Sequence, residues 1–211
     1  LQESWKTIED AGYTPSSLSD SKCGVYIGVA QGDYNIGQNY LASDLDSHNL
    51  TGNSTSILSA RISYLLNLKG PCMSIDTACS SSLVAIAQGC DSLVNGNNDM
   101  VLAGGVSVLT TPRMHIMTSK AGMLSADGKC YTFDQKADGF VPSEAIGIIL
   151  LKRLKDAEKD RDRIYGVIKG WGVNQDGSTN GITAPSKDSQ VALQSEIYDK
   201  FHIRPETITY V

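Results

Sequence analysis

The chain has 211 residues, of which 41% are hydrophobic and 19% charged, a composition typical of a globular protein with a buried core. Its formal net charge of −5 gives no electrostatic reason to expect nucleic acid or an anionic membrane as the main partner. The sequence shows neither a signal-peptide pattern nor an apolar run long enough for a transmembrane helix, so we expect neither secretion nor membrane insertion.

The chain contains five cysteines, and no two of them form a Cys-x-x-Cys pair. They are Cys23, Cys72, Cys79, Cys90 and Cys130. An odd number at this spacing indicates neither a disulfide framework nor a zinc site, and free thiols are typical of a reducing cytosol. We therefore expect a cytoplasmic protein without a bound metal.

Both ends of the chain look internal. Leu1, Trp5 and Ile8 already lie at helical spacing, so the first residue falls inside a predicted helix. The last residues, 208–211, break off within a strand-like run. We expect the sequence to be an internal piece of a longer protein.

The first third of the chain predicts a helix, a strand and a second helix. Residues 1–11 form the first helix, which Gly12 ends, and residues 23–30 form an apolar strand. Residues 31–53 are polar and give no periodic signal. A helix is then predicted over 54–68. Its expected core residues are Ile57, Ala60, Ile62, Tyr64 and Leu65.

The remaining elements alternate between strands and helices. Strands are predicted at 72–75, 99–109, 145–151 and 164–173, and helices at 83–88, 112–120, 154–160 and 186–201, with a loop over 122–139. The last helix is expected to pack through Val191, Leu193, Ile197 and Tyr198. Gly104 and Gly105 predict a close backbone approach or a bulge. Strands without polar alternation favour an α/β layered fold in which helices cover a mostly parallel or mixed sheet.

Cys79 lies between the strand at 72–75 and the helix at 83–88. The first turn of a helix has unpaired N–H groups and a partial positive charge, so it stabilises a thiolate. The thiolate is the nucleophilic form of cysteine, which makes Cys79 a candidate catalytic nucleophile. The bare pattern also fits a small buried apolar residue, the commoner role of a free cysteine.

Several further motifs occur in one order along the chain. They are Trp5-Lys6-Thr7-Ile8-Glu9-Asp10-Ala11-Gly12, Ala60-Arg61-Ile62-Ser63-Tyr64, Gly70-Pro71, Asp76-Thr77-Ala78-Cys79-Ser80-Ser81-Ser82, Leu102-Ala103-Gly104-Gly105-Val106, Ala121-Gly122-Met123-Leu124-Ser125, Phe133-Asp134, Ala137-Asp138-Gly139-Phe140, Val173-Asn174-Gln175-Asp176-Gly177 and Gly181-Ile182-Thr183-Ala184-Pro185. Together they resemble the ketosynthase (beta-ketoacyl synthase) domain of modular type I polyketide synthases and of fatty-acid synthases, in the thiolase-like superfamily. The resemblance covers nearly the whole chain and implies that Cys79 is the catalytic cysteine.

The resemblance implies a thiolase-like layered α-β-α-β-α fold. Residues 1–163 would form the N-terminal ketosynthase region, incomplete at its start, and 164–211 the beginning of the C-terminal region. The implied reaction is acyl transfer from a carrier-protein thioester to Cys79, followed by decarboxylative Claisen condensation with a malonyl-type extender. The backbone N–H of Cys79 is one candidate donor to the oxyanion.

The same resemblance implies the partners. No cofactor is bound directly, because the substrates arrive on the phosphopantetheine of an acyl carrier protein. An acyltransferase supplies the extender, and the intact domain forms a homodimer. The segment Phe140-Val141-Pro142-Ser143-Glu144 departs from the usual glycine-rich version and resembles bacterial synthases whose acyltransferase acts in trans.

The family's two catalytic histidines are expected beyond Val211. His48, His115 and His202 lie in none of the family's histidine motifs, so we assign them no role. The chain alone is therefore not expected to catalyse condensation.

Three polar groupings have simpler explanations than catalysis. Ser80, Ser81 and Ser82 lack the Gly-x-Ser-x-Gly pattern of a serine hydrolase, so their hydroxyls are expected to cap free helix amides. The segment 133–139 lacks the alternating ligands of a calcium loop and is interpreted as a structural loop near the active site. A basic group is expected to form a solvated face, with carrier-protein docking as the alternative. It comprises Lys152, Arg153, Lys155 and Lys159.

Three alternatives stay open at this point. A non-elongating domain of the same fold would hold acyl chains without condensing them. A fatty-acid synthase ketosynthase shares these central motifs. A cysteine hydrolase would need a nearby histidine base and access for water.

Overall fold

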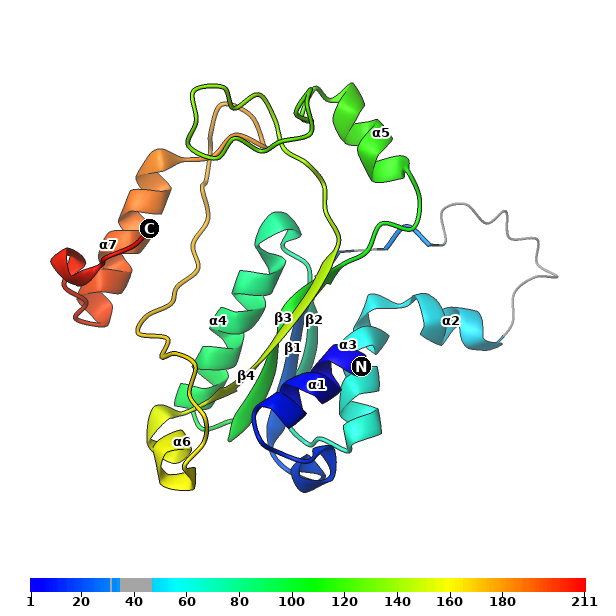
Figure 1. The fold of residues 1–211 in the computed structure, drawn as a ribbon, viewed down its shortest axis with the longest axis vertical. Helices are drawn as coiled ribbons and strands as arrows, with labels where there is room; N and C mark the ends of the chain where they lie inside the picture. The colour runs from blue at the N-terminus through cyan, green and yellow to red at the C-terminus, as the bar shows by residue number, and fades with distance from the viewer. Residues whose placement is uncertain (31, 35–46) are drawn as a thin grey trace.

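The computed structural model describes residues 1–30, 32–34 and 47–211, and its described part contains one four-stranded sheet in the order β2-β1-β3-β4. The strands are β1 (Cys23–Val29), β2 (Cys72–Ile75), β3 (Met100–Ser107) and β4 (Ala145–Lys152). β1 is parallel to both β2 and β3, whereas β4 is antiparallel to β3. Parallel neighbours need crossover connections, and helices supply them here (Figure 1).

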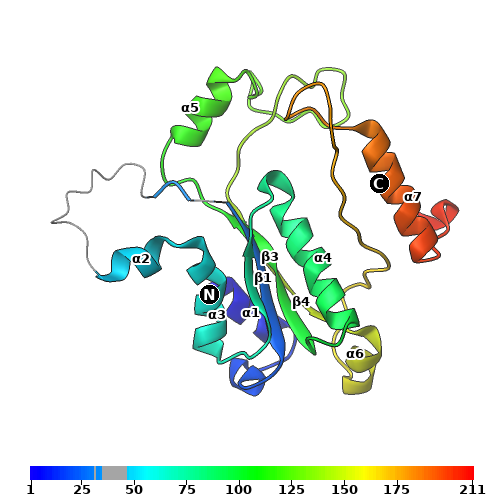
Figure 2. The same ribbon diagram turned by 180° about the vertical axis from the view of Figure 1, so that it is seen from behind.

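Helices cover both faces of the sheet. α3 (Thr55–Leu66) connects β1 to β2 and packs on one face, where α1 (Gln2–Asp10) lies against β4. α4 (Ser81–Val94) connects β2 to β3 and packs on the opposite face, against β1 and β3. Figures 1 and 2 show this three-layer arrangement from its two sides.

The strand sequences explain why both faces can be buried. Along β1, Val25 and Ile27 belong to the core shared with α1 and α3, while Tyr26 belongs to the core under α4. In β3, Leu102 faces the first core and Val101 the second. Side chains alternate across a strand, so a continuous apolar run supplies both cores at once.

The remaining elements lie around this unit. They are α2 (Ser47–Asn53), α5 (Arg113–Lys120), α6 (Leu154–Asp160), α7 (Lys187–Lys200) and the 3-10 turns η1 (Pro15–Leu18), η3 (Ala78–Ser80) and η4 (Pro205–Thr207). α5 and α7 stand away from the sheet (Figure 2). Within the described residues, no helix has the length and apolarity to cross a membrane.

Most predicted elements are present, but several expectations about them were wrong. On α7, Val191 is 53% exposed and does not pack as expected. The segment 164–173 is not a strand, because no described strand runs beside it to pair with its backbone groups. β4 is not buried on both faces; several of its residues are exposed, since it is the edge strand beyond β3. On α3, Tyr64 and Leu65 are 83% and 60% exposed, and Ser59 and Leu66 are buried instead.

α2 was not predicted, because its sequence carries no apolar face. The other part of that polar stretch that gave no signal, residues 31 and 35–46, lies outside the described residues. The predicted close approach at Gly104 and Gly105 is confirmed. A Cβ on Gly104 would lie 2.0 Å from the carbonyl oxygen of Gly147 in β4.

Lys152 joins three segments at the end of β4. Its ammonium donates to Asp160 at 2.5 Å, to Asp162 at 2.7 Å and to the Tyr13 hydroxyl at 2.8 Å. Its side chain is only 12% exposed, so the solvated face predicted for this residue was wrong. Burial alone would lower the pKa of Lys152, but these hydrogen bonds raise it above its usual value. Burial alone would raise the pKa of Asp162, and the bonds from Lys152 and Tyr13 lower it.

Lys152→Met should lower the free energy of unfolding at pH 7 by about 2 kcal/mol, because it leaves the partly buried Asp162 carboxylate without its cation, with only the Tyr13 hydroxyl still bonded to it. The contribution of Asp162 is present above its unfolded pKa and is lost as the pH falls through its folded pKa. That of Lys152 is present below its unfolded pKa and is lost as the pH rises through its folded pKa. Urea unfolding should therefore show the largest difference between wild type and variant from about pH 4 to 10. Lys155→Met, at an exposed position on α6, is the control and should change stability by less than about 0.5 kcal/mol.

Candidate active site

Cys79 lies where β2 passes into α4, as the sequence predicts. β2 ends at Ile75, the turn η3 contains the cysteine, and α4 begins two residues later at Ser81. The Cys79 side chain is exposed, whereas Cys23 and Cys90 are buried. Burial raises the pKa of the Cys23 thiol to about 12 and that of Cys90 to about 11. Cys79 is thus an accessible thiol at the start of a 14-residue helix.

A sharp backbone turn presents this thiol. Ala78 has a φ of 56°, in the left-handed region that costs about 1–2 kcal/mol for a residue with a Cβ. Two hydrogen bonds hold it there: its N–H donates to the Asp76 carboxylate at 3.1 Å, and its carbonyl accepts from the Ser81 hydroxyl at 2.6 Å. Such strain persists only where surrounding contacts determine the conformation.

The serines that follow stabilise the turn and do not cap the helix. The Ser80 hydroxyl donates to the carbonyl and hydroxyl oxygens of Thr77, both at 2.9 Å. The Ser81 hydroxyl accepts from the Thr77 N–H at 2.9 Å and donates to Ala78. No side-chain cap bond forms at the N-terminus of α4 within the described residues. The predicted capping role was therefore wrong, and the first amides of α4 have no serine hydroxyl on them.

Two glycines in register let the start of α4 approach the sheet. Gly28 of β1 pairs with Gly105 of β3. A Cβ on Gly28 would lie 2.5 Å from the backbone carbonyl carbon of Ser81, and one on Gly105 would lie 2.7 Å from Cβ of Ser82. Real Cβ atoms do not come this close to other atoms. Because neither glycine has a side chain, the start of α4 packs directly against the strand backbones, and we call this pair of residues the glycine seat. The glycine seat sets the distance of the helix start from the sheet, and with it the position of Cys79.

The opposite end of α4 is also held. Arg153, which follows β4, donates to the carbonyl of Leu93 at 3.0 Å and to that of Asn98 at 2.7 Å. It also pairs with Asp99 and Asp156, so the solvated face predicted for Arg153 was wrong as well. An arginine at a helix C-terminus satisfies the last carbonyls and opposes the negative end of the dipole. Lys155 and Lys159 are exposed, as predicted.

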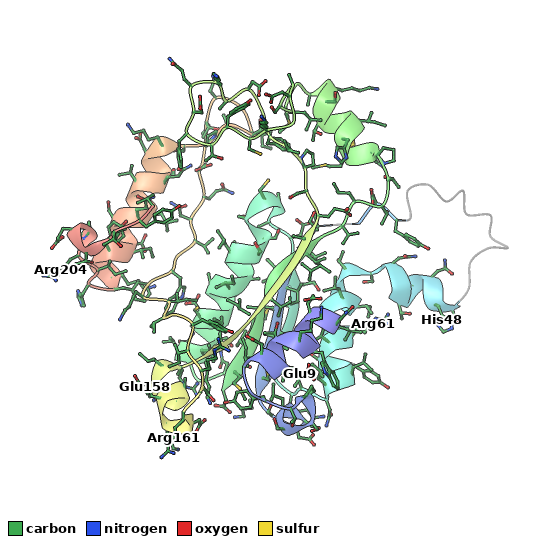
Figure 3. All side chains as sticks on the ribbon, in the orientation of Figure 1. Glu9, His48, Arg61, Glu158, Arg161 and Arg204 are labelled. Carbon is green, nitrogen blue, oxygen red and sulfur yellow. The ribbon has the colours of Figure 1, made fainter. Side chains whose placement is uncertain are left out.

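The other sequence candidates lie on separate elements. His48 lies on α2, at the outer edge of the molecule (Figure 3), His115 lies on α5, and His202 follows α7. In the loop at 133–139, the Asp134 and Asp138 carboxylates accept backbone N–H groups from Lys136 and Ala126. Within the described residues, no group forms a hydrogen bond with the Cys79 sulfur.

A cavity of about 1060 Å³ lies elsewhere, between α1, β4, the C-terminal half of α4 and residues 162–171. Ile149, Leu151 and Trp171 contribute to its largely apolar lining. Cys79 is not among the residues that line it. Sequence reasoning missed this cavity because it treated β4 and 164–173 as two buried strands.

Comparison with known families adds a second line of evidence. The family described as "Beta-ketoacyl synthase, N-terminal domain" matches residues 1–157, and "Beta-ketoacyl synthase, C-terminal domain" matches residues 165–211. The chain belongs to the beta-ketoacyl synthase family. The predicted resemblance to ketosynthases is thereby confirmed.

Relatives of this ketosynthase chain include Polyketide synthase PksL from Bacillus subtilis (strain 168), which is 53% identical over 211 residues, or 100% of this chain and 5% of that protein. Polyketide synthase GfsA from Streptomyces halstedii is 45% identical over 190 residues, or 90% of this chain and 2% of that protein. The chain thus spans a small part of the curated relatives that it matches.

Solved ketosynthases have the same fold. The ketosynthase from module 6 of the bacillaene synthase of Bacillus subtilis 168 superposes with a TM-score of 0.91 at 52% identity, covering 99% of this chain and 35% of that one. The oxazolomycin ketosynthase domain from Streptomyces albus JA3453 gives 0.86 at 34% identity, covering 97% and 36%. The expected thiolase-like α/β fold is therefore confirmed.

Gly28→Ala should destabilise this ketosynthase chain by about 1–3 kcal/mol, because the added methyl group meets the Ser81 backbone. It should also slow alkylation of Cys79, since the start of α4 must lift from the sheet. Urea unfolding and iodoacetamide labelling measure the two effects. Gly147→Ala is the matched control, because a Cβ at that strand glycine meets nothing within 4 Å. Equal behaviour of the two variants would contradict the glycine seat.

Proposed function

We propose that this chain carries the acyl-binding half of a ketosynthase reaction in polyketide biosynthesis, with Cys79 as the nucleophile. The observation that carries the proposal is the exposed thiol on a strained strand-to-helix turn, in a chain that matches the beta-ketoacyl synthase family almost throughout. The named relatives are polyketide synthases, which supports this pathway over fatty-acid synthesis.

In the first step, the Cys79 thiolate attacks the carbonyl carbon of an acyl thioester on the phosphopantetheine arm of an acyl carrier protein. A new bond from Sγ to that carbon forms, and the bond from the carbon to the pantetheine sulfur breaks. The Cys79 thiol loses one proton when it becomes the thiolate, and the released pantetheine thiolate takes up one proton to become a thiol. This step stores the chain as a covalent intermediate.

The N-terminus of α4 supports this step electrostatically. Its first amides carry a partial positive charge, and the serine hydroxyls nearby are engaged with the turn. A thiolate before reaction, and an oxyanion during it, both gain from such a site. The backbone N–H of Cys79 is our candidate for one oxyanion donor.

The second step is decarboxylative condensation with a malonyl-type extender. The extender loses carbon dioxide, its carbanion attacks the acyl carbon on Cys79, and the thiolate leaves. In the family this step uses two histidines, and we assign neither role to His48, His115 or His202. The isolated chain is accordingly proposed to accept an acyl group without elongating it.

Several finer assignments follow from the same proposal. We place the boundary between the two ketosynthase regions at residues 163 and 164, and the five free cysteines support a reducing, cytosolic setting. The edge strand β2, with Met73 46% exposed, supports pairing with a second copy of the domain. Pro142 and Ser143 support an acyltransferase acting in trans. The exposed face of β4 supports packing against further parts of a longer chain.

Iodoacetamide at pH 7.5 should label Cys79 before the other cysteines. At this pH an ordinary thiol, with a pKa of about 8.5, is mostly protonated and reacts slowly. Cys23 and Cys90 should lag by at least about a hundredfold, because pKa values of about 12 and about 11 leave them protonated. Peptide mapping by mass spectrometry after short exposures measures the order. Faster labelling of Cys130, the other exposed thiol, would count against an activated Cys79.

An acyl pantetheine thioester should add one acyl mass to the wild-type chain and none to Cys79→Ala, because only this sulfur forms the intermediate. Intact-mass spectrometry measures the adduct, and the Cys130→Ala variant is the control that keeps Cys79. Supplying a malonyl thioester should give no elongated product with this chain alone. An elongated product would show that condensation by this chain does not need the two histidines that the family uses.

A further inference from the structure

Asp33, in the loop after β1, accepts four hydrogen bonds from two threonines in the loop after β3. Its Oδ1 accepts from the N–H of Thr110 at 3.0 Å and from the Thr110 hydroxyl. Its Oδ2 accepts from the N–H of Thr111 at 2.9 Å and from the Thr111 hydroxyl at 2.7 Å. Each oxygen thus has two donors. These bonds, led by the Thr110 and Thr111 hydroxyls, hold the pKa of Asp33 well below its usual range.

The strand register places this bridge at the same edge of the sheet as the catalytic turn. Ile75, Gly28 and Gly105 stand in one row across β2, β1 and β3. Cys79 comes four residues after Ile75 in the sequence, and Asp33 and Thr110 each come five residues after the glycine of their own strand. The carboxyl ends of parallel strands meet at one edge, where α/β proteins bind their substrates. The Asp33 bridge therefore lies at the edge of the sheet from which the turn with Cys79 also departs.

The bridge also holds the loop that leads into α5. The loop at 108–112 leads directly into α5, and α5 makes no extensive contact with another described helix or strand. A second carboxylate, that of Glu144, accepts the N–H of Leu109 at 2.6 Å. Three successive amides of this loop are thus held by acidic side chains from two distant segments. Figure 2 shows α5 set apart from the sheet and joined to it through this loop.

We propose that Asp33 is a positioning residue for the Cys79 site, which fixes the rim loop 108–112, and through it α5, so that an acyl thioester reaches Cys79 in a defined orientation. This inference rests on the proposed acyl transfer to Cys79. Orientation of a reactant beside the attacking atom accelerates its reaction, whereas a small reagent needs no such rim. Loss of Asp33 therefore impairs a large acyl donor and spares a small alkylating agent.

The test compares Asp33→Asn with wild type in the full 211-residue chain. Asparagine keeps the shape but removes the charge and places an amide donor against the threonine donors. The second-order rate constant for acylation by octanoyl-pantetheine, kcat/KM, should fall roughly tenfold, chiefly because KM rises. A tenfold loss is the scale of one lost hydrogen bond to a charged group. The rate of Cys79 alkylation by iodoacetamide should stay within about twofold, since α4 and its glycine seat are unchanged.

Asp20→Asn is the matched control. Asp20 precedes the same strand, β1, at the opposite edge, and its ion pair with Lys69 is exposed at 3.5 Å. Exposed pairs contribute little, so this variant should leave both rates unchanged. A double variant, Thr110→Val with Thr111→Val, removes the hydroxyl donors from the other side of the bridge. It should reproduce part of the acylation defect, and combining it with Asp33→Asn should be less than additive.

Each result decides between the two proposals. If wild type is acylated at Cys79 and Asp33→Asn is acylated equally well, the positioning role is wrong while the proposed function stands. An equal loss with both probes would also overturn it, because that indicates general damage to the turn. If Asp33→Asn does not fold, as judged by circular dichroism, the threonine double variant gives the same decision. Failure of octanoyl-pantetheine to acylate wild type would refute both.

Discussion

The contact between the start of α4 and the backbones of β1 and β3 is the constraint on which the site depends. Gly28 and Gly105 lie side by side in the sheet, and any side chain there would collide with Ser81 or Ser82. Because the helix begins so close to the sheet, the chain turns sharply after β2, and Ala78 adopts the left-handed conformation. The turn leaves Cys79 exposed at the end of the helix where backbone amides favour an anion.

The helix α4, which follows Cys79, is held at both ends. At its far end, Arg153 bonds to the carbonyl of Leu93 and pairs with acidic neighbours. A buried hydrogen bond supports the same end of the helix: the Tyr26 hydroxyl of β1 donates to the Ser92 hydroxyl of α4 at 3.0 Å. Trp171 donates to Asp91 at 2.8 Å and ties the later part of the chain to this helix. A helix fixed at both ends keeps the turn before it in one position, which suits a reaction that depends on orientation.

Much of this arrangement could be predicted from local patterns. The apolar runs of β1 and β3 predict strands covered on both faces, and the Gly104-Gly105 pair predicts a close approach. The failures have physical causes. The segment 164–173 is as apolar as a strand, yet a strand forms only where a neighbour pairs with its backbone. Lys152 looks like one of several surface lysines, and only the folding of Asp162 and Tyr13 around it makes it a partly buried ion pair.

The sequence by itself determined the family, most of the strands and helices, and the candidate nucleophile, because these depend on residue types and their order. The tertiary structure alone decided what holds Cys79 in place. The serines next to Cys79 stabilise a turn and leave the helix amides uncapped. Asp33 accepts hydrogen bonds from Thr110 and Thr111, which lie 77 and 78 positions further along the chain. Such pairings join segments distant in sequence, and no local periodicity encodes which carboxylate will meet which amide.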